Sequence, residues 1–164
     1  MKRKTILTIL PVLISLLCGG LLAADSGALC DSARLAIEKA VLEVHSKMAA
    51  AAQDPDAEKM FAFILDAGPG TIIQNGVYMN SRQDALEAVK KGMQGVTKAE
   101  RSFTRTRVTV LSPGAALVTG SGTTTITLTD GRVLGSPIAL TEVFILKDGE
   151  WKLLHGHHSV PNRQ

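Results

Sequence analysis

The chain has 164 residues, which is enough for one domain with a sizeable core. Its formal net charge is +3, but three of the 18 Lys and Arg residues lie within the first four positions, while all 15 Asp and Glu residues follow position 24. Beyond that point the charges balance, and only 4% of the residues are aromatic, so the sequence lacks both the basic surface and the stacking rings of a nucleic-acid-binding protein.

Residues 1–24 have the order of a secretory signal peptide. A basic start is followed by a long apolar stretch and by the small residues Ala23 and Ala24, where cleavage is expected. The chain therefore divides into a signal peptide, residues 1–24, and a domain, residues 25–164. This predicts an exported protein, periplasmic or extracellular, with no membrane contact after cleavage. An uncleaved anchor is the alternative, because the apolar stretch is about long enough to cross a thin bilayer.

The first predicted helix follows the signal peptide. Its apolar residues recur at spacings of three and four, which indicates an amphipathic helix. These residues are Cys30, Ala33, Ile37, Val41, Val44 and Met48. Cys30 is the single cysteine left after cleavage, so no internal disulfide is expected, and its place on the apolar stripe predicts that it is buried.

Two shorter helices and a hairpin are predicted next. Asp54 followed by Pro55 is typical of a helix start. Asn75-Gly76 between β-branched residues is the dipeptide favoured in two-residue hairpin turns. Ser81 then resembles the first residue of a capping box and predicts a third helix.

Beyond residue 100 the pattern changes to strands. Four strands are predicted, over residues 102–111, 115–128, 133–146 and 151–160. The short turn sequences between them suit antiparallel hairpins. The predicted fold class is therefore α+β, with three N-terminal helices packed on a curved antiparallel meander sheet. Gly120, Gly122 and Gly135 allow the long strands to bend around a pocket.

The last predicted strand carries three of the four histidines. Strict alternation places Trp151, Leu153, His155, His157 and Ser159 on one face, with His158 on the other. Imidazoles titrate near neutral pH, so the first face predicts a pocket wall with acid/base groups, in which His157 is the stronger catalytic candidate. The alternative is a pair of structural histidines with ordinary hydrogen-bond partners.

Glu142 is the second catalytic candidate. It shares a strand face with Leu140 and Phe144, and a carboxyl group among apolar side chains is expected to have a raised pKa and to act as an acid or base. On an exposed face it would be an ordinary surface charge. A metal ion held by His155, His157 and Glu142 is a less favoured alternative, since such a site needs a third ligand from another strand and Glu142 is the only obvious candidate.

Three arginines alternate with Phe103 on the first of the four long strands. Arg101, Arg105 and Arg107 are expected on the outside of the sheet, with Arg107 as the exception if one of them binds an anion. The sequence contains no phosphate-binding glycine loop, no dinucleotide fingerprint, no serine-hydrolase elbow and no Cys-x-x-Cys pair. No cofactor is therefore expected.

The order of elements and several local strings resemble the NTF2-like superfamily, in particular its SnoaL-like, ketosteroid-isomerase-like branch. The strings are residues 61–66 before the hairpin, residues 81–85 at the third helix, and residues 148–153 followed by His157 and Ser159. The resemblance implies a cone with a deep apolar pocket, and commonly a homodimer. Members include isomerases, polyketide cyclases, dehydratases and domains of no known activity.

The resemblance also implies site residues. In ketosteroid-isomerase-like enzymes the general base is an aspartate in the hairpin before the third helix, and Asn75 stands at the matching position here. An amide cannot take a proton, so that isomerase mechanism is not expected. Asp66 matches a position that is often acidic, and Tyr78 is a further polar candidate for the pocket.

The sequence is therefore compatible with two functions. The favoured one is an exported module that binds a small apolar molecule in its cone. The other is an enzyme that performs metal-free acid/base chemistry, such as isomerisation, dehydration or cyclisation, with His157 and Glu142 as the proton-transfer groups. The second function predicts that these two side chains meet in one cavity.

Overall fold

A computed structural model describes residues 29–54, 56–68 and 71–160 of the chain. The predicted signal peptide and Pro55 lie outside the described residues. Among the helices that are described, none combines the length and the apolar character needed to cross a bilayer.

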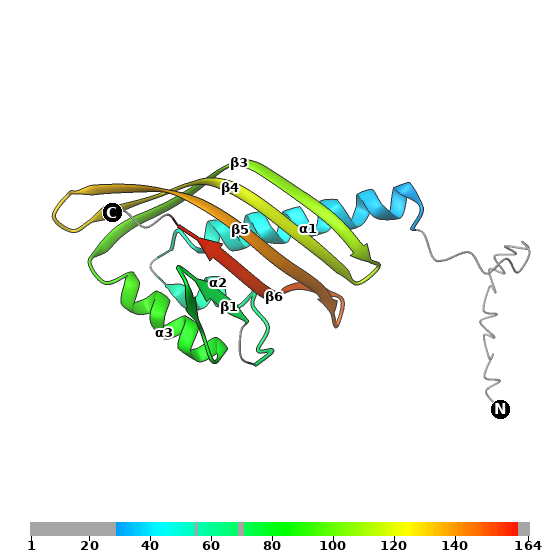
Figure 1. Cartoon of the computed structure of the whole chain (residues 1–164), viewed down its shortest axis with the longest axis horizontal. Helices are drawn as coiled ribbons and strands as arrows, with labels where there is room; N and C mark the ends of the chain where they lie inside the picture. Colours follow the sequence, from blue (N-terminus) through cyan, green and yellow to red (C-terminus); the bar gives the residue numbers. More distant parts are fainter. Residues whose placement is uncertain (1–28, 55, 69–70, 161–164) are drawn as a thin grey trace, which may run out of the picture.

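The described residues form three helices, which differ greatly in length. The first, α1, runs over Asp31–Ala51. The second, α2 (Ala57–Phe61), has only five residues, and α3 (Arg82–Gly92) has eleven. The expectation of three helices packed on the sheet is therefore only partly met. Helices α2 and α3 are short, and α1 is the described helix that runs along the long strands (Figure 1).

The starts of the helices test the predicted caps. Ser81 Oγ accepts a hydrogen bond from the Asp84 amide at 3.0 Å, so the predicted cap of α3 is confirmed. The cap of α2 is Asp56, whose carboxylate accepts from the Glu58 amide at 3.1 Å, and not Asp54. The prediction that Cys30 is buried is wrong, because it stands before the first residue of α1, where its side chain is exposed.

Six strands form one mixed sheet. They are β1 (Ile72–Gln74), β2 (Val77–Tyr78), β3 (Val96–Ser112), β4 (Ala115–Leu128), β5 (Val133–Lys147) and β6 (Glu150–Ser159), in the spatial order β2-β1-β6-β5-β4-β3. The α+β class and the β3–β6 meander are confirmed. The sheet is nevertheless not wholly antiparallel, because β1 pairs with β6 in parallel. The Asn75-Gly76 hairpin thus extends the main sheet and does not stand apart from it.

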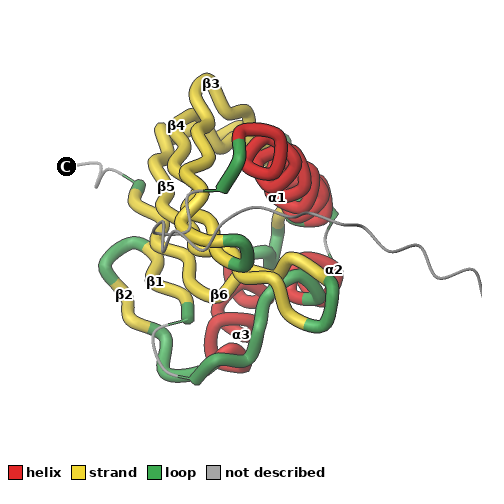
Figure 2. Tube along the Cα trace, turned by 90° about the vertical axis from the view of Figure 1, so that its right-hand side faces the viewer, coloured by secondary structure: helices red, strands yellow, loops and turns green. Residues whose placement is uncertain are grey.

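The helices lie on one side of this sheet (Figure 2). The core between the two layers contains Val41 of α1, Phe61 of α2 and, from the sheet, Val118, Phe144 and Leu153, each at most 1% exposed. Apolar stripes on α1 and on the inner sheet face meet there, which is the arrangement that removes both from water.

A bulge in β6 inverts the alternation of its side chains. Val143 of β5 pairs with His155, while the next residue, Phe144, pairs with Leu153, so β6 holds one extra residue at that point. An extra residue turns every later side chain to the other face. Leu153 faces the core before the bulge, and His158 faces it afterwards, whereas His157 is exposed. The predicted face of His155, His157 and Ser159 is therefore wrong.

A second bulge has the same effect in β3. The pairing shifts between Phe103 and Arg105, with Thr104 as the extra residue. Before this point Ala99, Arg101 and Phe103 face inward, and after it Arg105 is exposed, as is Arg107. The strands approach closely here, and a Cβ added to Gly122 would overlap the Ser102 carbonyl oxygen. The expectation that all three arginines share the outer face is wrong for Arg101.

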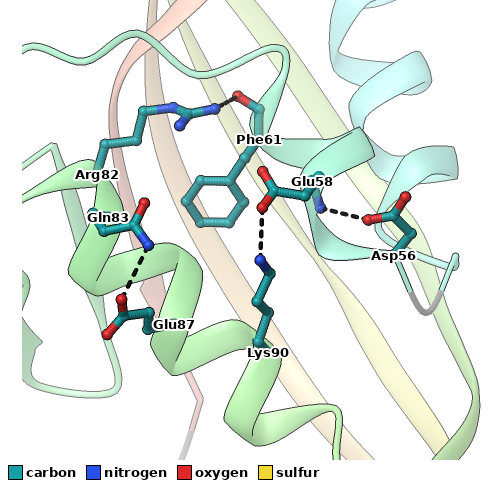
Figure 3. Close-up of polar contacts among 7 residues, drawn as sticks. All are labelled: Asp56, Glu58, Phe61, Arg82, Gln83, Glu87 and Lys90. Carbon is teal, nitrogen blue, oxygen red and sulfur yellow. Dashed lines mark hydrogen bonds and ion pairs between the residues drawn. The ribbon is translucent and has the colours of Figure 1, made fainter.

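Two side chains of α3, Arg82 and Lys90, fasten this helix to α2 and the residues that follow it (Figure 3). Arg82 donates from Nη2 to the Phe61 carbonyl at 2.6 Å and from Nε to the Ile64 carbonyl at 3.1 Å, with its guanidinium 5.5 Å from the centre of the Phe61 ring. At the other end of α3, Lys90 Nζ lies 2.6 Å from Glu58 Oε1. The charge-assisted bonds to carbonyls are the stronger of these contacts, since the lysine pair is exposed. Together they hold the helical wall opposite the sheet.

Candidate functional site

A buried carboxylate between two imidazoles joins three elements of the fold. Glu142 of β5 is 1% exposed, and its two oxygens accept hydrogen bonds from His45 of α1 and His158 of β6. The distances are 2.9 Å from His45 Nδ1 to Oε2 and 3.0 Å from His158 Nε2 to Oε1. We call these three residues the His–Glu–His cluster.

The placement of each member follows from the sequence pattern. His45 lies between Val41 and Met48 on the buried stripe of α1. Glu142 lies on the inner face of β5, where burial alternates with exposure. His158 reaches the same face only because of the bulge in β6. A glycine, Gly156, pairs with Glu142 across the strands, so no side chain separates the carboxylate from the His158 ring.

The cluster keeps Glu142 ionised. Burial raises the pKa of Glu142, but hydrogen bonds from His158 and His45 and the positive charge that the rings can carry outweigh it and lower the pKa to about 2. The expectation of a raised pKa is therefore wrong. An ionised carboxylate only accepts hydrogen bonds, so His45 Nδ1 and His158 Nε2 both carry a proton.

His45 makes its other contacts with aromatic rings. Its ring centre lies 5.1 Å from that of Phe103 and 6.5 Å from that of Phe144. Within the described part of the chain, its Nε2 is buried without a hydrogen-bond partner. Nδ1 is thus the nitrogen of His45 that binds Glu142, and Nε2 faces the buried interior.

Two adjoining cavities lie against the sheet, one of them between the sheet and helices α2 and α3 and the other lined by strand and loop residues. One has a volume of about 380 Å³ and the other of about 350 Å³. They share the lining residues Gln74, Asn75, Arg101, Thr124 and Ile126. Volumes of this size are typical of sites for small organic molecules.

The walls of the larger cavity are mainly apolar. They include Ala57 and Met60 of α2, Val89 of α3, and Met79, Met93 and Ile126. Apart from Asp54, which pairs with Lys59, the polar side chains of this lining lie where the two cavities meet: Gln74, Asn75, Arg101 and Thr124. The second cavity adds His158 there and so brings the His–Glu–His cluster to the cavity surface. A ligand here would meet an apolar wall on one side and several hydrogen-bonding groups on the other.

The predicted catalytic pair does not meet in the cavity. Glu142 is buried as the apolar pattern indicated, but His157 is exposed on the outer face of β6. The histidine that contacts Glu142 is His158, which strict alternation had placed on the other face. His155 is partly buried on the outer side of the bulge, and Ser159 is exposed, with its hydroxyl 3.4 Å from the Ala139 carbonyl oxygen.

The other predicted pocket residues are divided between cavity, core and surface. Asn75 lines both cavities and has the positive φ of 52° that its turn requires. Its backbone N–H donates to the His158 carbonyl at 3.1 Å. Trp151 packs against the core. Tyr78 is 54% exposed on β2, and Asp66 is exposed in the loop after α2.

The predicted set lacks four residues that the site argument uses, namely His45, Arg101, Thr124 and His158. A signal for His45 was present, since it lies four residues after Val41 and three before Met48 on the apolar stripe. Arg101 was assigned to the outer face because the bulge after Phe103 leaves no mark in the sequence that strict alternation can detect. Within the described residues, no set of three or more His, Cys, Asp or Glu side chains is arranged to hold a metal ion.

The low pKa of Glu142 predicts a specific loss of stability in acid. Its folded pKa of about 2 lies below its ordinary value of 4.5, so the carboxylate stabilises the fold above about pH 4.5 and ceases to do so as pH falls towards 2. Glu142→Gln removes this titration. In urea unfolding, its free energy of unfolding should therefore fall less between these pH values than that of the wild type. Glu87→Gln, an exposed control on α3, should retain the wild-type slope; equal slopes for all three proteins would contradict the assignment.

Solved structures with the same fold are found in the NTF2-like superfamily. A putative dehydratase of the NTF2-like family from Streptomyces avermitilis has 20% sequence identity, with 76% of this chain and 97% of the other covered and a TM-score of 0.67. For a hexachlorocyclohexane dehydrochlorinase from Novosphingobium barchaimii the values are 15%, 81%, 92% and 0.67. For a putative scytalone dehydratase from Novosphingobium aromaticivorans they are 10%, 81%, 89% and 0.69.

These identities establish the fold and leave the activity open. No curated protein matches the sequence. The model of the SnoaL-like domain matches residues 41–163, which contain the whole sheet, α2, α3 and every member of the His–Glu–His cluster. The fold is that of the solved NTF2-like structures, and the chain belongs to the SnoaL-like domain family.

Proposed function

We propose that the protein binds a small organic molecule in the paired cavities, with the apolar part of the ligand against α2, α3 and the sheet. The observation that carries this proposal is the division of the lining: apolar side chains form most of the wall, and a few polar groups converge where the cavities meet. Such a division gives affinity through burial and orientation through hydrogen bonds.

We further propose that the protein is exported and forms a homodimer, and the evidence for these two features does not come from the cavity. The signal-peptide pattern of residues 1–24 supports a role outside the cytoplasm. The family resemblance supports a homodimer. Neither the cavity nor the cluster depends on these two features.

A substitution at the cavity rim tests binding. Ala88 of α3 is exposed and lines the larger cavity, so Ala88→Trp should narrow the entrance and leave the core intact. We expect the neutral fluorescent probe N-phenyl-1-naphthylamine to bind the wild type and to bind the variant about tenfold or more weakly, a loss of roughly 1.4 kcal/mol. The control is Glu87→Trp, one position away and exposed. No binding to the wild type, or an equal loss in both variants, would contradict the proposal.

A second candidate function is proton transfer at the cavity surface. It is favoured by His158, which lines the cavity and whose Nε2 is fixed by a buried carboxylate, leaving Nδ1 as the ring nitrogen not bound to Glu142. A carboxylate that orients an imidazole in this way is a frequent arrangement for general bases. The neighbours named as dehydratases and as a dehydrochlorinase make elimination the reaction class to consider.

Hydrogen–deuterium exchange tests this candidate without knowledge of the substrate. In D₂O, the wild type should speed exchange of the α-protons of cyclohexanone, measured by ¹H NMR, by about 100-fold or more over buffer. His158→Gln should abolish the effect, because it removes the base. His157→Gln, a change at the exposed neighbour, should leave it unchanged. Loss of exchange in His157→Gln with retention in His158→Gln would refute the role of His158.

A further inference from the structure

Arg101 places a positive charge inside the ligand site. It lies on β3 between Ala99 and Phe103, which face inward, and it lines both cavities. The bulge after Phe103 separates it from Arg105 and Arg107, which are exposed. Of these three arginines, Arg101 is thus the one that lines the paired cavities.

No protein group neutralises this charge by direct contact. Among the described residues, neither a hydrogen bond nor an ion pair joins the Arg101 guanidinium to a side chain or a carbonyl, although most of the exposed lysines pair with nearby carboxylates. Burial lowers the pKa of Arg101, and the charge of Glu142 acts in the opposite direction. Both oxygens of Glu142 are already bound by the two imidazoles. The five N–H donors of a guanidinium therefore remain available to a ligand.

A buried hydroxyl to which the described residues offer no hydrogen-bond partner lies directly beside Arg101. Thr124 of β4, which carries this hydroxyl, pairs with Arg101 across the strands and lines both cavities as well. Within the described residues, the Thr124 hydroxyl is buried and has no hydrogen-bond partner. A buried hydroxyl without a partner destabilises the fold, and a ligand oxygen that accepts from the hydroxyl would remove this penalty.

We propose that Arg101 and Thr124 form an anion subsite, and that the ligand is a small monocarboxylate with an apolar body. This inference rests on the proposed binding function and specifies its ligand class. A carboxylate matches the planar fork of a guanidinium and can accept from the hydroxyl as well. A single negative charge suits the site better than the double charge of a phosphate, because ionised Glu142 lies nearby.

Calorimetric titration with three ligands of one shape tests the proposal. The ligands are cyclohexylacetate, cyclohexylacetamide and 2-cyclohexylethylamine, which are negative, neutral and positive. We expect the wild type to bind the carboxylate about tenfold or more tightly than the amide, and the amine most weakly. Arg101→Gln should bring the carboxylate and the amide to within about threefold of each other. Arg105→Gln, on the outer face of the same strand, should keep the wild-type preference.

The outcomes separate this inference from the proposed function. Equal binding of carboxylate and amide by the wild type, or a preference that survives in Arg101→Gln, would overturn the anion subsite and leave cavity binding intact. Failure of all three ligands and of N-phenyl-1-naphthylamine would overturn both. Thr124→Val provides a second variant if Arg101→Gln does not fold. It should weaken the carboxylate more than the amide, and an equal effect on both would count against the subsite.

Discussion

A carboxylate that is 1% exposed keeps its charge only where hydrogen-bond donors surround it, and Glu142 meets this condition with two imidazoles from different parts of the chain. His45 brings α1 to this point, and His158 brings the last strand. Removal of either ring would leave a charge partly uncompensated in the core. The long helix and the two central strands are thereby joined by a polar contact in an otherwise apolar interface.

The same contact sets the chemistry of the cavity. His158 is both a member of the cluster and a lining residue, so a ligand would sense the buried carboxylate through one imidazole ring. Arg101 approaches from β3 with the opposite charge, and among the described residues no hydrogen bond or ion pair joins its guanidinium to another group. The site thus combines a fixed negative charge that is already hydrogen-bonded with a positive charge that is not. Such an asymmetry favours an anionic group of the ligand at the guanidinium, while the apolar wall favours a ligand whose remaining part is apolar.

The sequence allowed much of the fold to be predicted and less of the site. Helix α3 and strands β4 and β5 follow from capping, turn and alternation signals that act over a few residues, and the family resemblance places them in a cone. The site depends on two bulges, each of one residue, at Leu154 and Thr104. A bulge is a property of the pairing between two strands, so alternation within one strand cannot reveal it. It is the reason that His157 and the inward Arg101 were assigned to the wrong faces, whereas Glu142, on a strand without a bulge before it, was assigned correctly.

We expect ligands to bind where the two cavities meet, beside Arg101 and His158, and away from His155 and His157 on the outer side of β6. Long-range ¹H–¹⁵N NMR of the imidazole and guanidinium nitrogens tests it most directly, with cyclohexylacetate added to the ¹⁵N-labelled protein. We expect the ¹⁵N resonances of the His158 ring and of Arg101 Nε to shift together as the site saturates with ligand, while the ¹⁵N resonances of the His157 ring do not move. Shifts confined to His155 and His157, with none at His158 or Arg101, would contradict it.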